Sequence, residues 1–113
     1  MLKDRQIEVE KMFYAIATQM GARIVNFYAC LGTEEYPDSC SLYFEVEYCC
    51  SRRKIRISNH TKQHKDVPFQ KDLKSLTLYD DTSMDNLERF IRNRINEMKR
   101  GAVWAAFNMI KSA

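Results

Sequence analysis

Hydrophobic residues recur at helical spacing near the N-terminus of this chain and at every second position in its middle. Over residues 4–20 the apolar positions fall three or four apart, and Gly21 follows as a helix stop. The pattern therefore predicts an N-terminal amphipathic helix, whose apolar stripe consists of Val9, Met12, Phe13, Ile16 and Met20.

The middle of the chain carries the strand signal. From Leu42 to His60 apolar and polar residues alternate on both sides of a short polar break, as they do in two paired strands with one buried face. We predict these strands at about Ser41–Cys49 and Arg53–Ser58, and an earlier strand at Arg23–Leu31. The segment Gly32–Ser39 is a loop by its Gly, Pro, Asp and Ser content.

Strand alternation assigns each side chain to one face of the sheet. The residues of the second and third strands expected to face the core are Phe44, Val46, Tyr48, Ile55 and Ile57. Their neighbours face outward, which places the acidic Glu45 and Glu47 beside the basic Lys54 and Arg56. Such cross-strand charge pairs contribute roughly 0.2–1 kcal/mol each, so part of the basic character of this hairpin is neutralised.

A fourth strand signal and the facing of the first strand complete the predicted sheet. Ser75–Tyr79, SLTLY, predicts a fourth short strand after the long polar segment Asn59–Lys74. Within the first strand, alternation places Phe27 on one face and Ile24 on the other.

The C-terminal part of the chain returns to helical spacing. An apolar stripe formed by Leu87, Phe90, Ile91, Ile95 and Met98 leads to Gly101. The pattern resumes over Ala102–Lys111, which predicts two consecutive helices or one long helix kinked at Gly101. We expect Trp104 in the core, because Val103 and Phe107 surround the same region.

Together these elements predict one α+β domain over residues 1–113, in the order α-β-β-β-(β)-α-α. An antiparallel three- or four-stranded sheet with helices packed on one face would bury every apolar stripe. The expected core consists of Phe13, Ile16, Phe27, Phe44, Val46, Ile55, Ile57, Leu87, Ile91, Ile95 and Phe107.

Composition places the chain among small globular proteins of the cytoplasm. Hydrophobic residues make up 45% of the chain and charged residues 29%, which excludes a disordered tail. The apolar run Ala102–Phe107 is far shorter than the about 20 residues of a membrane helix. The charged N-terminal residues leave no apolar core for a secretory signal.

The four cysteines are expected to be reduced thiols, because nothing marks an oxidising compartment. Cys49 and Cys50 are adjacent in the predicted second strand, where their side chains would point to opposite faces. Cys30 and Cys40 flank the loop Gly32–Ser39 and could face each other across a hairpin, but we do not favour a bridge between them.

Charge is divided between the two halves of the chain. Residues 1–50 contain four Lys or Arg against eight Asp or Glu, whereas residues 51–113 contain fourteen against seven. The candidate binding residues for a protein partner or for phosphate are Arg52, Arg53, Lys54, Arg56, His60, Lys62, Lys65, Arg89 and Arg92. Clustered basic side chains favour nucleic acid, but solvated surfaces also carry such patches.

Sequence motifs for catalysis and for metal or cofactor binding are missing. His60 and His64 are spaced as zinc ligands often are, but the adjacent Cys49 and Cys50 lack the two to four intervening residues of a zinc finger. The chain contains no G-x-S-x-G, P-loop or dinucleotide fingerprint. A Cys-His nucleophile pair remains the third alternative. We expect no enzyme activity, no metal and no cofactor.

Two resemblances bear on function. The order α-β-β-β-α is similar to that of double-stranded-RNA-binding domains, but the chain lacks their Gly-Pro-His loop and their Lys-Lys-x-Ala-Lys helix start, so no residue is carried over. Lys54–His60, KIRISNH, resembles a strand-ending Arg-x-Ser-Asp/Asn-His element of small phage and mobile-element proteins. This resemblance covers seven residues and implies an accessory protein that blocks a host or defence protein.

The sequence therefore favours a small non-catalytic binding protein that covers a surface on another protein. The surfaces expected to make contact are the basic hairpin turn, the loop over residues 59–71 and the aromatic Tyr36. Trp104 is a second candidate contact residue, although the core is the favoured place for it. The alternative function is nucleic-acid binding through the basic residues 52–65.

Overall fold

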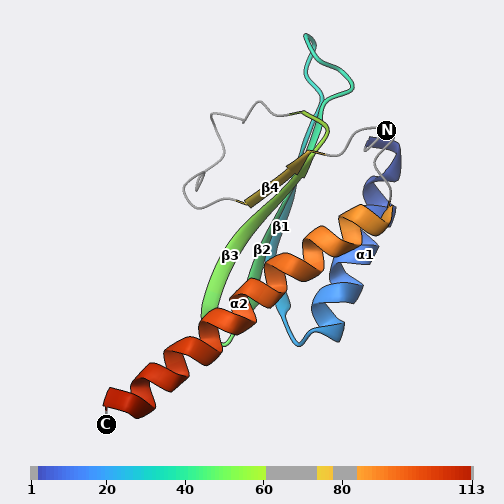
Figure 1. Cartoon of the computed structure of the whole chain (residues 1–113). Helices are drawn as coiled ribbons and strands as arrows, with labels where there is room; N and C mark the ends of the chain where they lie inside the picture. The colour runs from blue at the N-terminus through green and yellow to red at the C-terminus, as the bar shows by residue number, and fades with distance from the viewer. Residues whose placement is uncertain (1–2, 61–73, 78–83, 113) are drawn as a thin grey trace.

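A computed structural model describes residues 3–60, 74–77 and 84–112 of the chain. It has the predicted α+β fold (Figure 1). A short 3-10 turn, η1, directly precedes the first helix. The elements are η1 (Lys3–Arg5), α1 (Gln6–Gln19), β1 (Arg23–Leu31), β2 (Cys40–Tyr48), β3 (Ser51–Ser58), β4 (Lys74–Thr77) and α2 (Met84–Ser112).

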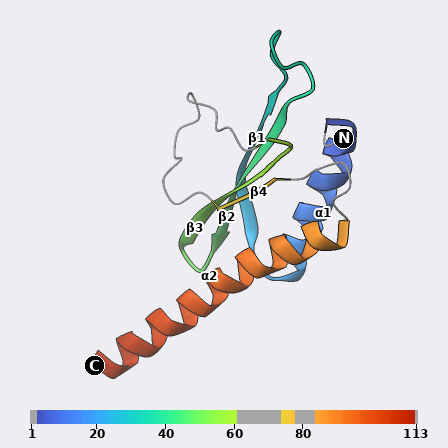
Figure 2. The same cartoon turned by 45° about the horizontal axis from the view of Figure 1, so that its top comes forward.

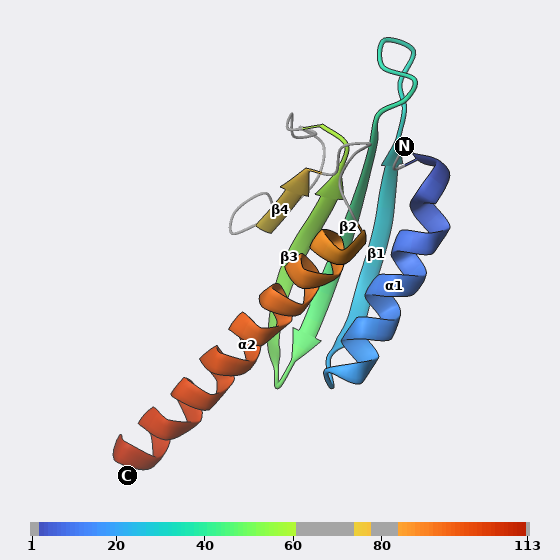
Figure 3. The ribbon, with the colours of Figure 1, turned by 45° about the vertical axis from the view of Figure 1, so that its right-hand side comes forward.

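The strands lie in the sheet in sequence order, β1-β2-β3-β4. The pairs β1–β2 and β2–β3 are antiparallel, as predicted, and the short β4 joins the edge of β3 in parallel. Both helices cover the same face of this sheet, with α1 over β1 and the N-terminal half of α2 crossing β2 and β3 (Figure 3). We call the face turned away from the helices the outer face.

The core lies between the sheet and the two helices, and Phe44 is at its centre. The Phe44 ring stacks on Phe13 of α1 at a centroid distance of 3.9 Å and meets Phe27 of β1 at 4.9 Å. Phe27 is half-buried and packs against the edge of the core. The remaining predicted core residues are fully buried, with the exception of Phe107.

A β-bulge changes the facing of β1. The register between β1 and β2 shifts between Ile24 and Asn26, so Val25 is the extra residue. Ile24 therefore pairs with Val46 and packs against the core. The prediction that Ile24 faces away from Phe27 was wrong, because simple alternation does not allow for an inserted residue.

The turn between β2 and β3 is tighter than predicted. Tyr48 pairs directly with Ser51, and Cys49 and Cys50 form the turn with φ values of +48° and +67°. Positive φ at both central residues is the geometry of a type I′ hairpin, which Asn-Gly normally supplies. Both cysteines are exposed, so their assignment to a strand with opposite facings was wrong.

One continuous helix, α2, replaces the two helices or kinked helix drawn from the sequence. Gly101 lies within it, and a Cβ at this position would meet no atom within 4 Å. Glycine lowers helix propensity by about 1 kcal/mol relative to alanine, and a long helix tolerates this. Beyond Gly101 the helix extends away from the sheet (Figure 1 and Figure 2). Within the described residues, no helix is long and apolar enough to cross a membrane.

Candidate functional site

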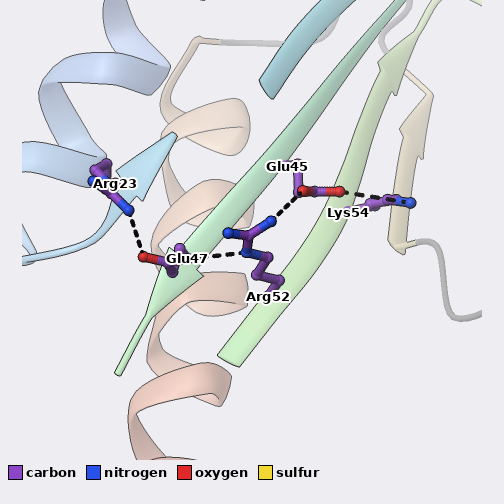
Figure 4. Close-up of polar contacts among 5 residues, drawn as sticks. All are labelled: Arg23, Glu45, Glu47, Arg52 and Lys54. Atoms are coloured by element: carbon purple, nitrogen blue, oxygen red, sulfur yellow. Dashed lines mark hydrogen bonds and ion pairs between the residues drawn. The ribbon is translucent and has the colours of Figure 1, made fainter. Parts of the chain in front are cut away.

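An ion-pair network occupies the outer face at the end of the sheet near the β2–β3 turn (Figure 4). Glu47 accepts hydrogen bonds from Arg23 at 2.7 Å and from Arg52 at 2.9 Å. Glu45 lies 3.5 Å from Arg52 and 3.6 Å from Lys54. The predicted pairing of acidic β2 with basic β3 is thus present, with Arg52 taking the place expected for Arg56.

The hydrogen bonds from Arg52 and Arg23 lower the pKa of Glu47. Because the folded pKa lies below the ordinary value of about 4.3, ionised Glu47 stabilises the fold above that pH. This contribution is lost as the pH falls through the folded pKa. We therefore expect Glu47→Gln to flatten the acid limb of the stability curve, measured by urea denaturation between about pH 6 and pH 3.

Glu34→Gln is the matched control for this pH experiment, since it removes one carboxylate from the exposed loop between β1 and β2. The Glu34→Gln variant should lose stability with falling pH as steeply as the wild-type protein does. If Glu47→Gln and the wild-type protein lose stability in parallel as the pH falls, the network does not contribute to acid sensitivity.

Arg56 lies on the outer face, as predicted, but it is only 1% exposed. Its Nη2 donates hydrogen bonds to the Ser58 hydroxyl at 3.1 Å, the Ser41 hydroxyl at 3.3 Å and the His60 carbonyl at 3.3 Å. The guanidinium also lies 5.9 Å from the centre of the Tyr43 ring. The expectation of a solvent-facing Arg56 was wrong, and its geometry is that of a structural residue.

His60 belongs to this buried arginine cluster. Its Nε2 lies 3.2 Å from the Ser41 hydroxyl, and its Nδ1 lies 3.5 Å from Arg56 Nη2. Burial raises the pKa of the neighbouring Tyr43, and Arg56 partly opposes that shift. His60 is half-buried just after the C-terminal end of β3, and its ring lies beside Ser41 and Arg56.

Of the remaining candidate cations, the three that the structure describes do not gather around Arg52. Arg53 alternates with Ile55 and is exposed at the end of the sheet on the helix side. Arg89 is exposed on α2, and Arg92 donates to Glu88 at 3.0 Å and to Gln19 at 2.9 Å. Lys62, Lys65 and His64 lie outside the described residues.

The cysteines and histidines do not converge in the described part of the chain. Cys30 pairs with Ser41, and Cys40 pairs with Leu31, so the two cysteines lie on opposite faces of the sheet. The proposed facing of Cys30 and Cys40 across the hairpin was therefore wrong. Burial raises the pKa of the Cys30 thiol. Among the described residues, no group of three or more His, Cys, Asp or Glu is arranged to hold a metal ion.

Three of the exposed large hydrophobic side chains in the described part of the chain lie on the segment of α2 that leaves the sheet. We name residues 99–112 the helix extension. Its exposed fractions are 70% for Val103, 71% for Trp104 and 61% for Phe107. Val103 and Trp104 precede Phe107 by four and three residues, so the three side chains share one side of the helix. We call this set the helix patch.

The prediction that Trp104 and Phe107 belong to the core was wrong, and helical register explains why. The buried residues of α2 are Leu87, Ile91, Ile95 and Met98, spaced four, four and three apart. The next position of this stripe, four residues after Met98, is Ala102. Val103 and Trp104 fall beyond it on another side of the helix. This departure from the spacing of the buried stripe is the sequence signal that could have indicated exposure of Val103 and Trp104.

The second exposed feature is the loop between β1 and β2, which we name the hairpin tip (residues 32–39). Thr33 N donates to the Tyr36 carbonyl at 3.1 Å, and Tyr36 N donates to Thr33 Oγ1 at 3.0 Å. Ser39 caps the same carbonyl through its N and Oγ. A Cβ at Gly32 would clash with the Pro37 carbonyl, so the turn requires glycine there. The tip thus holds Tyr36 outward, as the sequence predicted.

Comparison of the chain with protein-family models, with curated proteins and with solved structures found no match.

Proposed function

We propose that this protein is a small, non-catalytic, cytoplasmic binding protein that covers a surface on another protein. The observation that carries the proposal is the helix patch, with three large apolar side chains at 61–71% exposure on a helix that projects from the sheet. Exposed apolar patches of this kind are characteristic of interaction sites. Tryptophan is among the residues that most often dominate binding energy.

Helical geometry supports this use of the patch. An amphipathic helix binds a partner by laying anchors spaced three and four residues apart into an apolar groove. Trp104 and Phe107 have this spacing, and Val103 lies one turn before Phe107. A partner that covers the patch would also stabilise the residues beyond Gly101, which extend away from the sheet.

Nucleic-acid binding through residues 52–65 is the alternative, and it has less support. Arg52 and Lys54 are each held by glutamates of β2, and Arg56 is buried. Among the described residues of this segment, phosphate binding would have to break these ion pairs or to rely on the exposed Arg53. A partner protein that contacts the helix patch requires neither change.

Trp104→Ala should weaken binding to the partner at least tenfold, about 1.4 kcal/mol, and leave the free energy of unfolding within about 0.5 kcal/mol of wild type. The side chain is exposed, so its loss removes contacts with a partner but none with the core. The experiment is quantitative affinity capture from an extract of the native host, with mass spectrometry and urea denaturation of each variant.

Tyr14→Ala is the matched control, because Tyr14 is an exposed aromatic residue on α1. The proposal predicts proteins that wild type and Tyr14→Ala retain and Trp104→Ala loses. Submicromolar binding of random-sequence duplex DNA or RNA at physiological salt, steeply salt-dependent and weakened by Arg53→Ala, would support the alternative instead.

A further inference from the structure

The two ends of the molecule carry opposite charge. The hairpin tip contains three acidic residues, Glu34, Glu35 and Asp38, and no basic residue. The helix extension contains three basic residues in its sequence, Lys99, Arg100 and Lys111, and no acidic residue. Arg100 is exposed, whereas the Lys99 ammonium lies 5.7 Å from the centre of the Tyr48 ring of β2. The tip and the C-terminal end of α2 lie at opposite ends of the structure (Figure 1 and Figure 3), which measures 57 Å along its longest axis.

Each end also presents apolar surface. The hairpin tip carries Tyr36, which is 56% exposed, and Leu31 is half-exposed where β1 enters the tip. The helix extension carries the helix patch. The tip is held in one conformation by the hydrogen bonds of Thr33, Tyr36 and Ser39, and Asn59 ties its base by bonding Cys40 N and the Asp38 carbonyl. A pre-organised surface loses little entropy on binding.

We propose that the hairpin tip of one copy docks on the helix patch of a second copy. In this contact Tyr36 packs against Trp104 and Phe107, and the tip carboxylates lie near Arg100. The reverse contact forms at the other end when the two molecules run antiparallel about a two-fold axis. Two-fold symmetry closes the assembly as a dimer, whereas a single head-to-tail contact would propagate as a chain.

Direct pairing of the two helix extensions is less favourable. Antiparallel pairing centred between Trp104 and Phe107 would place Arg100 of each copy beside Lys111 of the other. Like charges at an interface cost free energy and suppress association. The acidic hairpin tip is complementary in charge to the same surface, and this complementarity selects the tip as the occupant.

The expected interface is small. An aromatic side chain offers about 150–250 Å² of surface in all, and Tyr36, Trp104 and Phe107 are 56–71% exposed. Three aromatic residues in each of two contacts therefore supply roughly 500–1,000 Å², which is the size of weak and transient interfaces. We therefore expect a dimer that dissociates at micromolar concentrations rather than an obligate one.

The test is sedimentation velocity of the full chain between about 1 and 300 µM, a range that brackets a micromolar Kd. Wild type should change from monomer to dimer across this range, and salt should weaken the dimer. Two double variants, each measured by itself, should weaken self-association at least about tenfold through like-charge repulsion at both contacts. They are Glu34→Lys/Glu35→Lys in the hairpin tip and Arg100→Glu/Lys111→Glu in the helix extension. An equimolar mixture of the two variants should dimerise again, because each tip then meets a helix of opposite charge.

Asp4→Lys/Glu8→Lys is the matched control, since it makes the same change in net charge on the exposed N-terminal face, and it should dimerise like wild type. A wild-type chain that is monomeric throughout the range overturns the proposal. So does a dimer that Trp104→Ala abolishes while both charge reversals leave it intact, because the helix extensions would then pair with each other.

This inference concerns the same helix patch as the proposed function but a different occupant, and the two can fail separately. A monomeric protein that captures a partner through Trp104 overturns the dimer and keeps the proposed function. A dimer that responds to the charge reversals as described, with no Trp104-dependent partner, keeps the dimer and overturns the proposed function.

Discussion

Phe44→Ala should lower the free energy of unfolding by about 3–5 kcal/mol, the range measured for buried phenylalanines in other proteins. Phe44 is fully buried and stacks on Phe13 of α1 at 3.9 Å. It also contacts the Phe27 ring of β1 at 4.9 Å. The substitution would leave a cavity between the sheet and the helix that the surrounding backbone cannot fill. Urea denaturation followed by circular dichroism measures the loss.

Phe107→Ala provides the matched control, because the same chemical change is made at a position that is largely exposed. It should change the free energy of unfolding by less than about 0.5 kcal/mol. If Phe44→Ala costs less than about 1 kcal/mol, its side chain does not hold the sheet to α1.

Arg56→Ala should destabilise the protein by roughly 2–3 kcal/mol, because charged hydrogen bonds in buried surroundings are worth more than neutral ones. The loss would leave the hydroxyls of Ser41 and Ser58 and the carbonyl of His60 without the guanidinium they share. Arg56→Lys should recover only part of the loss, since an ammonium cannot reproduce the planar fork of donors. Urea denaturation of each variant gives the comparison.

Lys54→Ala is the control on the same strand and face. Lys54 is half-buried and lies 3.6 Å from Glu45 in an ion pair, so Lys54→Ala should cost less than the loss of the fully buried Arg56 with its three hydrogen bonds. A similar loss for Lys54→Ala and Arg56→Ala would mean that burial of Arg56 adds nothing to stability.

The pairing of β2 with β3 and the composition of the core could be predicted from the sequence, because both follow from alternation of apolar residues. Phe44, Ile55 and Ile57 show this pattern plainly, and all three are buried. The ion pairs on the outer face also follow, since opposite charges occupy facing positions in the register of Glu45 with Lys54.

The sequence could not indicate the burial of Arg56. Alternation places Arg56 on the outer face, and its charge then implies solvent. Whether an outer face is covered depends on tertiary packing, which local periodicity does not contain. The bulge at Val25 likewise inserts one residue without a turn signal in the sequence.

The candidate site was predicted less well than the fold, because apolar residues in a helix were assumed to be buried. Val103 and Trp104 do not continue the spacing of the buried residues that ends at Met98. They are exposed because α2 continues as one helix past Gly101 and extends away from the sheet. Tyr36 was predicted on an exposed loop and is found there.

Gly101 divides α2 into two lengths that need not melt together. The N-terminal length is anchored by Ile91, Ile95 and Met98 in the core, whereas glycine at the junction weakens helix propagation by about 1 kcal/mol. Backbone amides beyond Gly101 should therefore exchange with solvent through local fraying, while those before it exchange only when the whole domain unfolds. A molecule that binds the helix patch needs residues 103–107 in helical conformation. Its apparent affinity is therefore lowered by the fraction of time that these residues are frayed.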